Sequence, residues 1–233
     1  MYGRSAQVYD ALYASKDYAG EAAQLHIIIQ QSCPGAASLL DVACGTGKHV
    51  AHLRAHYRVE GLDINPDLLA LAQEQNPGIA FHQGDMLSFA LEKQFDAVVC
   101  LFSAIGYVKT VGKLQGAVAT MARHLRPGGV LIIEPWITPQ AWRPSTVHST
   151  FVDEPDLKIA RLNVSEVDDR VAVMDLHHLV GTPEGVEYFV ERHELGLFTH
   201  EEYVGAYQDA KLAVAHDAKG LIGRGLYVGV LAK

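Results

Sequence analysis

Residues 38–47 read Ser38-Leu39-Leu40-Asp41-Val42-Ala43-Cys44-Gly45-Thr46-Gly47, and the rest of the fold can be worked out from this run. An apolar stretch reaches an acidic residue and then a turn with two glycines, after which residues 48–57 have a helical pattern. This order is typical of a first β-strand that leads into a nucleotide-binding loop. Gly45 and Gly47 have no side chains, so main-chain N–H groups can approach a ligand closely.

The turn differs from two common phosphate-binding motifs. His49 and Val50 stand where the third glycine of the dinucleotide fingerprint G-x-G-x-x-G would fall, and the G-K-[ST] ending of a P-loop is absent. Pyrophosphate and triphosphate ligands are therefore disfavoured. The form Asp-x-x-Cys-Gly-Thr-Gly instead resembles motif I of class I methyltransferases, which implies S-adenosyl-L-methionine as the cofactor.

A second strand is predicted over residues 59–63 and ends in the carboxylate of Asp63. An acidic residue at this place in nucleotide-binding α/β folds takes the two ribose hydroxyls. Asp63 could instead cap the helix predicted over residues 66–75. Asn65, followed by Pro66, fits that cap better, which leaves Asp63 free for a ligand.

Three more apolar segments, residues 80–86, 95–101 and 128–134, predict further strands. A helix is predicted over residues 112–125 and is ended by a turn at 126–129. Near-continuous apolar strands that alternate with helices indicate a parallel sheet covered on both faces. The ligand of such a sheet is expected at the carboxyl ends of its strands.

The resemblance to class I methyltransferases assigns roles to residues at these strand ends. Asp85-Met86 matches the pair that holds adenine in those enzymes. Their N-terminal segment folds over the cofactor as a lid, so tyrosines ahead of the first strand are expected there. The cofactor-binding residues that the resemblance implies are Tyr9, Tyr18, Asp41, Ala43, Gly45, Gly47, Asp63, Ile64, Asp85, Met86 and Leu101.

The predicted fold class is α/β, a doubly wound, seven-stranded, mostly parallel class I methyltransferase sheet with an inserted antiparallel β meander. The meander is expected because residues 157–167, 170–180 and 185–197 alternate apolar and polar residues between turns. Thr199 and Glu202 then form a capping box that starts a helix. We predict an N-terminal lid segment and helix over 1–36, a cofactor-binding core over 37–139 and 198–233, and a substrate cover over 140–197.

Composition excludes several other classes. The net charge of −8 argues against a nucleic-acid polymer as partner, because phosphate contacts need clusters of Lys and Arg. The sequence has no apolar run long enough to span a bilayer and no signal-peptide core, so no membrane partner is expected. Three cysteines without metal-ligand spacing are interpreted as reduced thiols of a cytoplasmic protein, and no metal site is predicted. A homodimer is compatible with these properties.

A closer resemblance rests on longer strings. These are Ala14-Ser15-Lys16-Asp17-Tyr18, Asp41-Val42-Ala43-Cys44-Gly45-Thr46-Gly47, Gln83-Gly84-Asp85-Met86, Glu134-Pro135-Trp136 and Gly223-Arg224-Gly225-Leu226. With them the chain is similar, along nearly its whole length, to the N,N-dimethyltransferases of TDP-linked amino-deoxysugars in macrolide-type antibiotic pathways. The resemblance implies that the substrate-binding residues are Tyr2, Glu134, Trp136 and Arg224. A guanidinium fork at Arg224 suits a diphosphate.

Two departures from that family bear on the chemistry. The family's Ser-Ser-Ile-Gly-His string, which carries a catalytic histidine, is replaced by Ser103-Ala104-Ile105-Gly106-Tyr107, and the second tryptophan of Glu-Pro-Trp-Trp is replaced by Ile137. A phenol, with a reference pKa of about 10, is a poor base near neutral pH. Tyr107 is therefore expected to orient the amine while a histidine takes the proton. The candidates are His177, which matches a family histidine, His178 and His193.

The function predicted from the sequence is S-adenosylmethionine-dependent N-methylation of a TDP-linked amino-deoxysugar. One alternative is methylation of another small natural-product amine or hydroxyl. An alternative of a different class is a non-catalytic nucleoside-binding regulatory module, which the replacement at Tyr107 favours. A dinucleotide oxidoreductase is the third, weakened by the absent glycine of the fingerprint.

Overall fold

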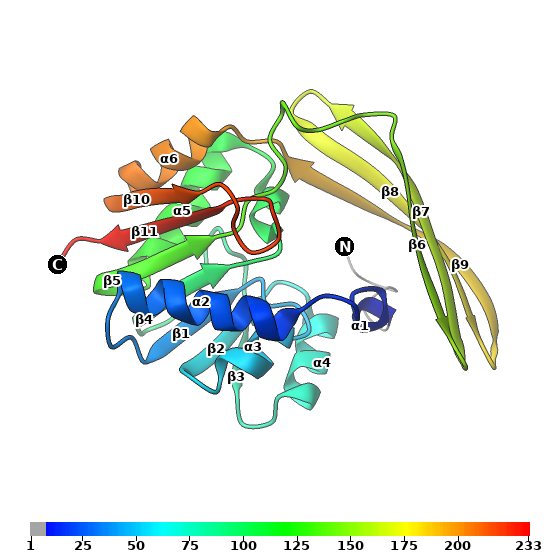
Figure 1. Ribbon diagram of the computed structural model, residues 1–233, viewed down its shortest axis with the longest axis horizontal. Helices are drawn as coiled ribbons and strands as arrows, with labels where there is room; N and C mark the ends of the chain where they lie inside the picture. Colours follow the sequence, from blue (N-terminus) through cyan, green and yellow to red (C-terminus); the bar gives the residue numbers. More distant parts are fainter. Residues whose placement is uncertain (1–7) are drawn as a thin grey trace.

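The computed structural model describes residues 8–233, and its centre is a seven-stranded sheet with the strand order β10-β11-β5-β4-β1-β2-β3 (Figure 1). Strands β3, β2, β1, β4 and β5 run parallel, whereas β11 is antiparallel to β5 and β10 to β11. The strands are β1 Ser38–Val42, β2 Arg58–Asp63, β3 Ala80–Gln83, β4 Phe95–Cys100, β5 Leu125–Ile133, β10 Leu212–Asp217 and β11 Leu226–Leu231. The predicted doubly wound, mostly parallel sheet is confirmed.

Helices cover both faces of this sheet because its central strands are buried on both sides. The residues are α2 Tyr18–Ser32, α3 Lys48–Leu53, α4 Pro66–Gln75, α5 Val111–Arg123 and α6 His200–Asp209. Apolar side chains of α2, α3 and α4 pack on one face, and those of α5 and α6 pack on the other. The predicted caps are present, since the Asn65 side chain accepts hydrogen bonds at the start of α4 and Thr199 with Glu202 forms a capping box on α6.

A second sheet of four antiparallel strands lies beside the core, at the end far from the C-terminus (Figure 1). Its strands are β6 Val147–Glu154, β7 Leu157–Asp168, β8 Val171–Thr182 and β9 Gly185–Gly196. The short 3₁₀ helix η2, Ala104–Val108, follows β4 and packs against β9. The sheet therefore stands at the carboxyl ends of the parallel strands, where a ligand is expected.

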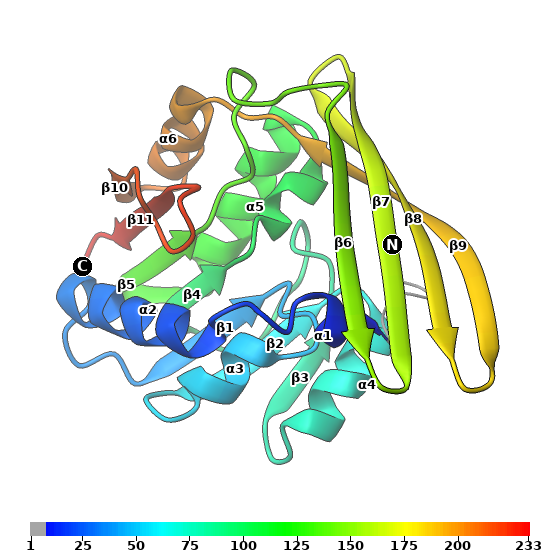
Figure 2. The ribbon, with the colours of Figure 1, turned by 45° about the vertical axis from the view of Figure 1, so that its right-hand side comes forward.

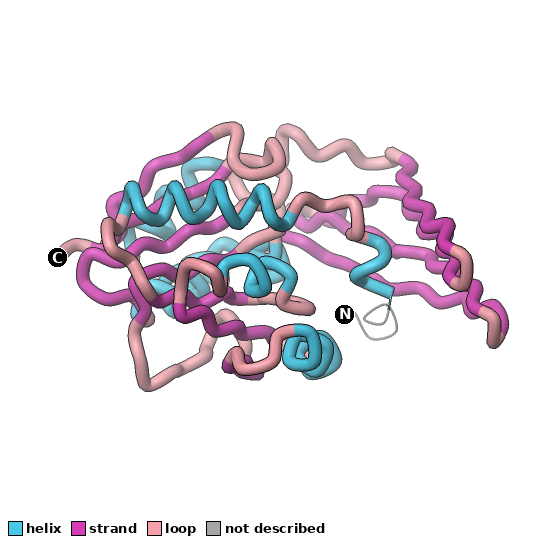
Figure 3. Tube along the Cα trace, turned by 60° about the horizontal axis from the view of Figure 1, so that its bottom comes forward, coloured by secondary structure: helices cyan, strands magenta, loops and turns pink. Residues whose placement is uncertain are grey.

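The first helix, α1 Tyr9–Leu12, lies between the core and the second sheet (Figures 2 and 3). Leu12 is buried against Ile159, Val180 and Phe189 of that sheet. One end of the second sheet is thereby attached to the core through α1, and the other through η2 and the chain that follows β5.

Several boundaries differ from those predicted. The 126–129 segment is not a turn before a strand but part of β5, which starts at Leu125 and shifts its register against β4 between Phe95 and Ala97. The first strand of the second sheet, β6, was not predicted, because almost all of its residues are exposed and leave no alternating apolar pattern. Helix α2 begins after Asp17, whose side chain caps it, and α3 ends at Leu53.

The second sheet spans residues 147–196, within the predicted insertion over 140–197. The division into three units stays a prediction. Within residues 8–233, none of the helices has the length and apolar character that crossing a membrane requires.

Candidate active site

The loop after β1 has a backbone shape that only glycine-rich sequences adopt without strain. Gly45 and Gly47 have φ angles of 56° and 76°, in the left-handed region. A Cβ added at Gly47 would lie 2.8 Å from the side-chain nitrogen of Asn76. Gly47 is also the N-cap of α3, so its backbone connects the loop directly to the helix.

Asp63, at the end of β2, holds this loop in place. One carboxylate oxygen accepts a hydrogen bond from the Gly45 amide at 2.9 Å, and the other accepts one from the Asn65 amide at 2.9 Å. Burial raises the pKa of Asp63, although backbone hydrogen bonds oppose that effect. Asn65 caps α4, as expected, but Asp63 also has backbone partners that the sequence did not indicate. Each carboxylate oxygen has a second lone pair, so Asp63 can still accept a ligand hydroxyl.

Asp41, in β1, has a different environment. It is 1% exposed, and within residues 8–233 neither of its carboxylate oxygens has a hydrogen-bond partner. Burial, together with the nearby charge of Asp63, raises the pKa of Asp41 to about 8. An unpaired carboxylate in the wall of a pocket favours a cationic or N–H-rich ligand.

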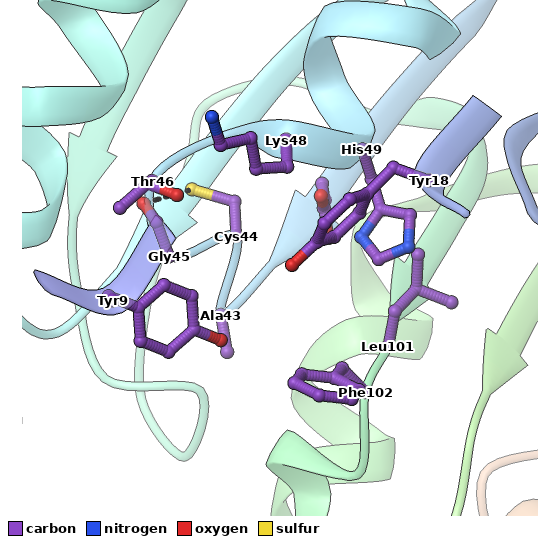
Figure 4. A pocket seen from close by; sticks show the side chains of 11 residues that line it. Tyr9, Tyr18, Ala43, Cys44, Gly45, Thr46, Lys48, His49, Leu101 and Phe102 are labelled. Atoms are coloured by element: carbon purple, nitrogen blue, oxygen red, sulfur yellow. Dashed lines mark hydrogen bonds between the residues drawn. The ribbon is translucent and has the colours of Figure 1, made fainter. Parts of the chain in front are cut away.

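A pocket at the carboxyl ends of β1 and β4 brings together many of the predicted cofactor residues (Figure 4). Tyr9 comes from α1, Tyr18 from α2, and Leu101 follows β4. The residues that line the pocket are Tyr9, Tyr18, Asp41, Ala43, Cys44, Gly45, Thr46, Lys48, His49, Leu101 and Phe102.

Five predicted cofactor residues do not line this pocket. Gly47 and Asp63 belong to the glycine loop and to the strand end that holds it, whereas Ile64, Asp85 and Met86 lie along the adjoining edge. Ile64 follows Asp63 and is 59% exposed. Asp85 and Met86 follow β3, which pairs with β2, and the Gly84 amide bonds to the Asp63 carbonyl oxygen at 2.9 Å. The structure thus brings them to the same sheet edge as Asp63.

Contacts of Asp10, which the sequence did not single out, fasten α1 over the loop. Its carboxylate accepts hydrogen bonds from the Thr46 hydroxyl at 2.7 Å and from Gln75 at 2.8 Å, and it pairs with Lys48 at 2.9 Å. Burial alone would raise the pKa of Asp10, but these partners lower it. No sequence pattern signalled this role, because the four residues are far apart in the chain.

A buried charge cluster flanks the pocket on its other side. Glu21 pairs with both Lys16 and His49, the latter at 2.8 Å. Burial opposes ionisation of Glu21, yet the hydrogen bonds from His49 and Lys16 lower its pKa overall. The Lys16 ammonium lies 4.8 Å from the ring centres of both Tyr18 and Phe102, so a cation stands behind two rings that line the pocket.

The predicted substrate residues gather beside Phe102. Glu134 is fully buried and accepts a hydrogen bond from the Phe102 amide at 2.6 Å. The Arg224 guanidinium donates to the Ser103 hydroxyl at 2.9 Å and lies 4.9 Å from the Trp136 ring centre. Burial lowers the pKa of Arg224, but a guanidinium remains charged in proteins. Tyr2 lies outside the described residues.

The two predicted catalytic residues are not brought together. His177 lies on the exposed face of the second sheet, where its Nδ1 is 2.7 Å from the Tyr188 hydroxyl. Tyr107, on η2, meets His193 instead, with 2.7 Å between its hydroxyl and His193 Nδ1. His178 shares the inner face with His193 but stacks on Phe189 and bonds to the Leu176 carbonyl oxygen.

The strand order, the glycine loop after β1 and the acidic residues ending β1 and β2 define a class I methyltransferase. A family model described as a methyltransferase domain matches residues 39–129. The dTDP-3-amino-3,4,6-trideoxy-alpha-D-glucopyranose N,N-dimethyltransferase of Streptomyces venezuelae is 40% identical over 97% of this chain and 98% of its own. The dTDP-3-amino-3,6-dideoxy-alpha-D-glucopyranose N,N-dimethyltransferase of Streptomyces fradiae is 38% identical over 98% of this chain and 91% of its own.

Solved structures agree with these relatives. The crystal structure of Streptomyces venezuelae DesVI superposes with a TM-score of 0.93 at 40% identity, over 97% of this chain and 98% of that one. The S-adenosylmethionine-bound CalS10, an amino pentose methyltransferase from Micromonospora echinaspora, gives 0.87 at 41% identity over 96% of each chain. The chain belongs to the family of S-adenosylmethionine-dependent sugar N-methyltransferases.

The pocket residues fit the family's cofactor, S-adenosyl-L-methionine. That molecule carries a sulfonium and an ammonium group. A cation that enters the pocket favours loss of the proton from the unpaired Asp41 carboxyl, which then supplies the opposite charge in a buried wall. Bare backbone at Gly45 leaves space, since nothing lies within 4 Å of a Cβ built there.

We expect Asp63→Ala to weaken S-adenosylmethionine binding by more than about tenfold, because hydrogen bonds to a charged acceptor at roughly 1.5 kcal/mol or more each are lost. The substitution also removes the hydrogen bond to the Gly45 amide, which should lower the affinity further. Calorimetric titration with S-adenosylmethionine measures the affinity. Asn65→Ala is the matched control, since it removes the cap of α4, costs about 1 kcal/mol of stability and leaves the affinity unchanged. An unchanged affinity in Asp63→Ala would exclude Asp63 from the site.

Asp41→Asn should stabilise the cofactor-free protein in a pH-dependent way. Folded Asp41 keeps its proton up to about pH 8, whereas the unfolded chain releases it near 3.8, so the stability gained from the retained proton is present at acidic pH and is lost as the pH rises through that window. Asparagine is neutral throughout. The variant should match the wild type near pH 4 and exceed it by more than about 1 kcal/mol near pH 8.

Thermal unfolding at the two pH values measures this difference, with exposed Asp156→Asn as the control that stays level with the wild type. The same Asp41→Asn substitution should weaken cofactor binding, because asparagine cannot become negatively charged when a cationic ligand enters the pocket. A difference in unfolding temperature that does not change with pH would contradict the unpaired state of Asp41.

Proposed function

We propose that this enzyme transfers a methyl group from S-adenosyl-L-methionine to the amino group of a TDP-linked amino-deoxysugar. The observation that carries the proposal is the position of Arg224, whose guanidinium is held by Ser103 and Trp136 beside Phe102, a residue that lines the pocket. A planar cation held in one orientation suits bidentate contact with a diphosphate. The relatives named above act on dTDP-linked amino sugars and match the chain over its whole length.

Within this proposal Asp41, Ala43, Gly45 and Gly47 contact the methionine end of the cofactor. Asp63 and Ile64 contact its ribose, and Asp85 and Met86 its adenine. Tyr9, Tyr18 and Leu101 close the pocket around it. Glu134, Trp136, Arg224 and the N-terminal Tyr2 contact the nucleotide-sugar. Support comes from the common sheet edge of the described residues, apart from Tyr2.

The cofactor, when bound, supplies a methyl carbon already activated by the positive sulfur. The protein has to hold the amine in line with that carbon, and correct orientation can supply about 7–11 kcal/mol of the barrier reduction. The buried side chains beside Phe102, such as Glu134, are suited to hold the amine in that orientation. The methylated nitrogen must then lose a proton, so the site also needs a group that accepts it.

A second candidate is methylation of another small natural-product amine or hydroxyl. The specific observation in its favour is that Tyr107 stands in place of the family's catalytic histidine. The same replacement favours a non-catalytic nucleoside-binding module. Incubation with S-adenosylmethionine and a panel of TDP-amino sugars, amino sugars without nucleotide and simple amines separates the three, because only the first proposal requires the nucleotide and only the last predicts no turnover.

The outer face of the second sheet supports a homodimer as a further part of the proposal. Eight large apolar side chains on this face are 43–74% exposed: Val147, Phe151, Leu162, Val164, Leu179, Val186, Tyr188 and Val190. Together they make an apolar surface of several hundred Å², the range at which a patch marks an interface. A standard interface buries about 800 Å² on each partner.

A second copy of the chain is the occupant that suits this face best. The charges at its rim are already paired within one subunit, Arg192 with Asp175 at 3.2 Å and with Glu194 at 2.9 Å. A two-fold axis would therefore bring together two apolar faces without like-charge repulsion. Such a dimer leaves the inner face and its pocket open. The three free cysteines support a reducing, cytoplasmic location.

If Arg224 clamps a diphosphate, Arg224→Lys should raise the KM for a TDP-sugar by about tenfold or more, since a point charge replaces a bidentate fork. Affinity for S-adenosylhomocysteine should stay unchanged in a calorimetric titration. Arg58→Lys is the control, because Arg58 is exposed and lies at the end of β2 opposite Asp63. This variant should keep the wild-type KM. An equal rise in KM for amines without a nucleotide would show that Arg224 acts on the fold or the cofactor.

Leu179→Asp places a charge in the middle of the outer face and should convert the dimer into a monomer with an intact fold. Analytical ultracentrifugation at micromolar concentration measures the mass of both proteins. Ile27→Asp changes an equally exposed apolar residue on α2 and should leave the dimer intact. A wild-type protein that sediments as a monomer would contradict this assembly.

A further inference from the structure

The replacement of the family histidine by Tyr107 is accompanied by a histidine from another strand. Tyr107 lies on η2, and its hydroxyl is 2.7 Å from Nδ1 of His193, which belongs to β9. The centres of the two rings are 6.0 Å apart, and the ring planes make an angle of 50°. Position 107 has no basic nitrogen of its own, but His193 Nδ1 is within hydrogen-bond distance of the hydroxyl at that position.

Tight packing fixes this pair. A Cβ added at Gly106, next to Tyr107, would lie 2.9 Å from a methyl carbon of Leu195 on β9. Only a glycine at this position lets η2 approach the strand so closely. His193 itself is 3% exposed, so its ring cannot swing away into solvent without disturbing the packing around it.

Charged and titratable groups surround His193 on the inner face of the second sheet. Glu191, on the same strand, has a carboxylate oxygen 3.8 Å from His193 Nε2. His178 of β8 and Arg161 of β7 face the same region, since the two are paired across the strands and His178 interacts electrostatically with Arg161, Glu191 and His193. Tyr107 faces His193 from η2. A carboxylate at this distance can balance a positive charge that arrives on the ring during the reaction.

We propose that His193 receives the proton of the methylated amine through the hydroxyl of Tyr107. This inference rests on the proposed N-methyltransferase function. The amine nitrogen forms a bond to the methyl carbon as the carbon–sulfur bond breaks, and the sulfur keeps the electron pair. The nitrogen is then an ammonium with one proton too many. That proton passes to the Tyr107 oxygen as the phenolic proton passes to Nδ1 of His193.

This route avoids a phenolate. A phenol has a reference pKa of about 10 and an imidazole one of about 6.5, so a tyrosine acting alone would need a large perturbation to hold a negative charge near neutral pH. Simultaneous transfer through the hydroxyl leaves Tyr107 neutral before and after the step. The charge ends on His193, next to the carboxylate of Glu191.

The other candidate histidines are less well placed. His177 is next to His178 in one strand, so its side chain points to the opposite face, away from Tyr107. His178 is on the correct face, but its ring stacks on Phe189 and its Nδ1 donates to the Leu176 carbonyl oxygen at 3.0 Å, whereas His193 contacts the Tyr107 hydroxyl.

The test compares wild type, His193→Asn, Tyr107→Phe and the double variant, all on the TDP-amino sugar that the wild type turns over. Asparagine can still accept the Tyr107 hydrogen bond near the Nδ1 position but takes no proton. We expect each single variant to lower kcat by about 100-fold, with the KM for the cofactor unchanged. The double variant should lose no more than either single one, because both interrupt the same route.

Two further readouts separate a proton route from a merely structural contact. The acid-side inflection of kcat against pH should be absent in His193→Asn. Adding Tyr107→His to His193→Asn puts an imidazole at position 107 and should recover at least about tenfold in kcat. His148→Asn, an exposed histidine on β6 that also bonds to a hydroxyl, should behave as wild type.

Wild-type kcat and an unchanged pH profile in His193→Asn would overturn the route, as would additive losses in the double variant. Thermal stabilisation by S-adenosylhomocysteine confirms that each variant is folded before it is compared. Absence of wild-type turnover on every TDP-amino sugar is a different result, since it overturns the proposed function and the route with it.

Discussion

The hydrogen bond from the Gly45 amide to Asp63 is the contact on which the site depends. It joins the loop after β1 to the end of β2, two neighbouring parallel strands, and it is buried and charge-assisted. The left-handed turn at Gly45 points the amide towards Asp63, and the other carboxylate oxygen holds Asn65 at the start of α4. One side chain thereby holds both the glycine loop, which precedes it in the chain, and the start of α4, which follows it.

Helix α1 and the second sheet are attached to the glycine loop that Asp63 holds. Asp10 ties α1 to Thr46 in the loop and to Lys48 at the start of α3, and Leu12, two residues later, is buried in the second sheet. The second sheet is therefore connected to the cofactor loop through a single short helix. Its other support is η2, pressed against β9 at Gly106. Glu134, Trp136 and Arg224, the residues proposed to contact the substrate, gather beside Phe102, which lines the pocket.

The sequence predicted the central sheet well because its strands are buried runs bounded by strong helix caps, such as Asn65 and Thr199. It could not predict β6, whose exposed residues show no period of two. It assigned Asp63 to the ligand alone, since the Gly45 contact joins residues 18 positions apart. The network of Asp10 has the same cause, because contacts between distant positions leave no local pattern.

The histidines of the second sheet show how the alternation of side chains along a strand bears on the choice of a proton acceptor. His177 matches a family residue, yet successive side chains in a strand point to opposite faces, and the buried partner of Tyr107 is on the inner one. Pairing of Met174 with His193 puts that histidine on the same face as Met174, Leu176 and His178. A shift of one residue in the register would send His193 outward and leave Tyr107 without it. The register of β8 against β9 is therefore as much a part of the chemistry as the residue at position 107.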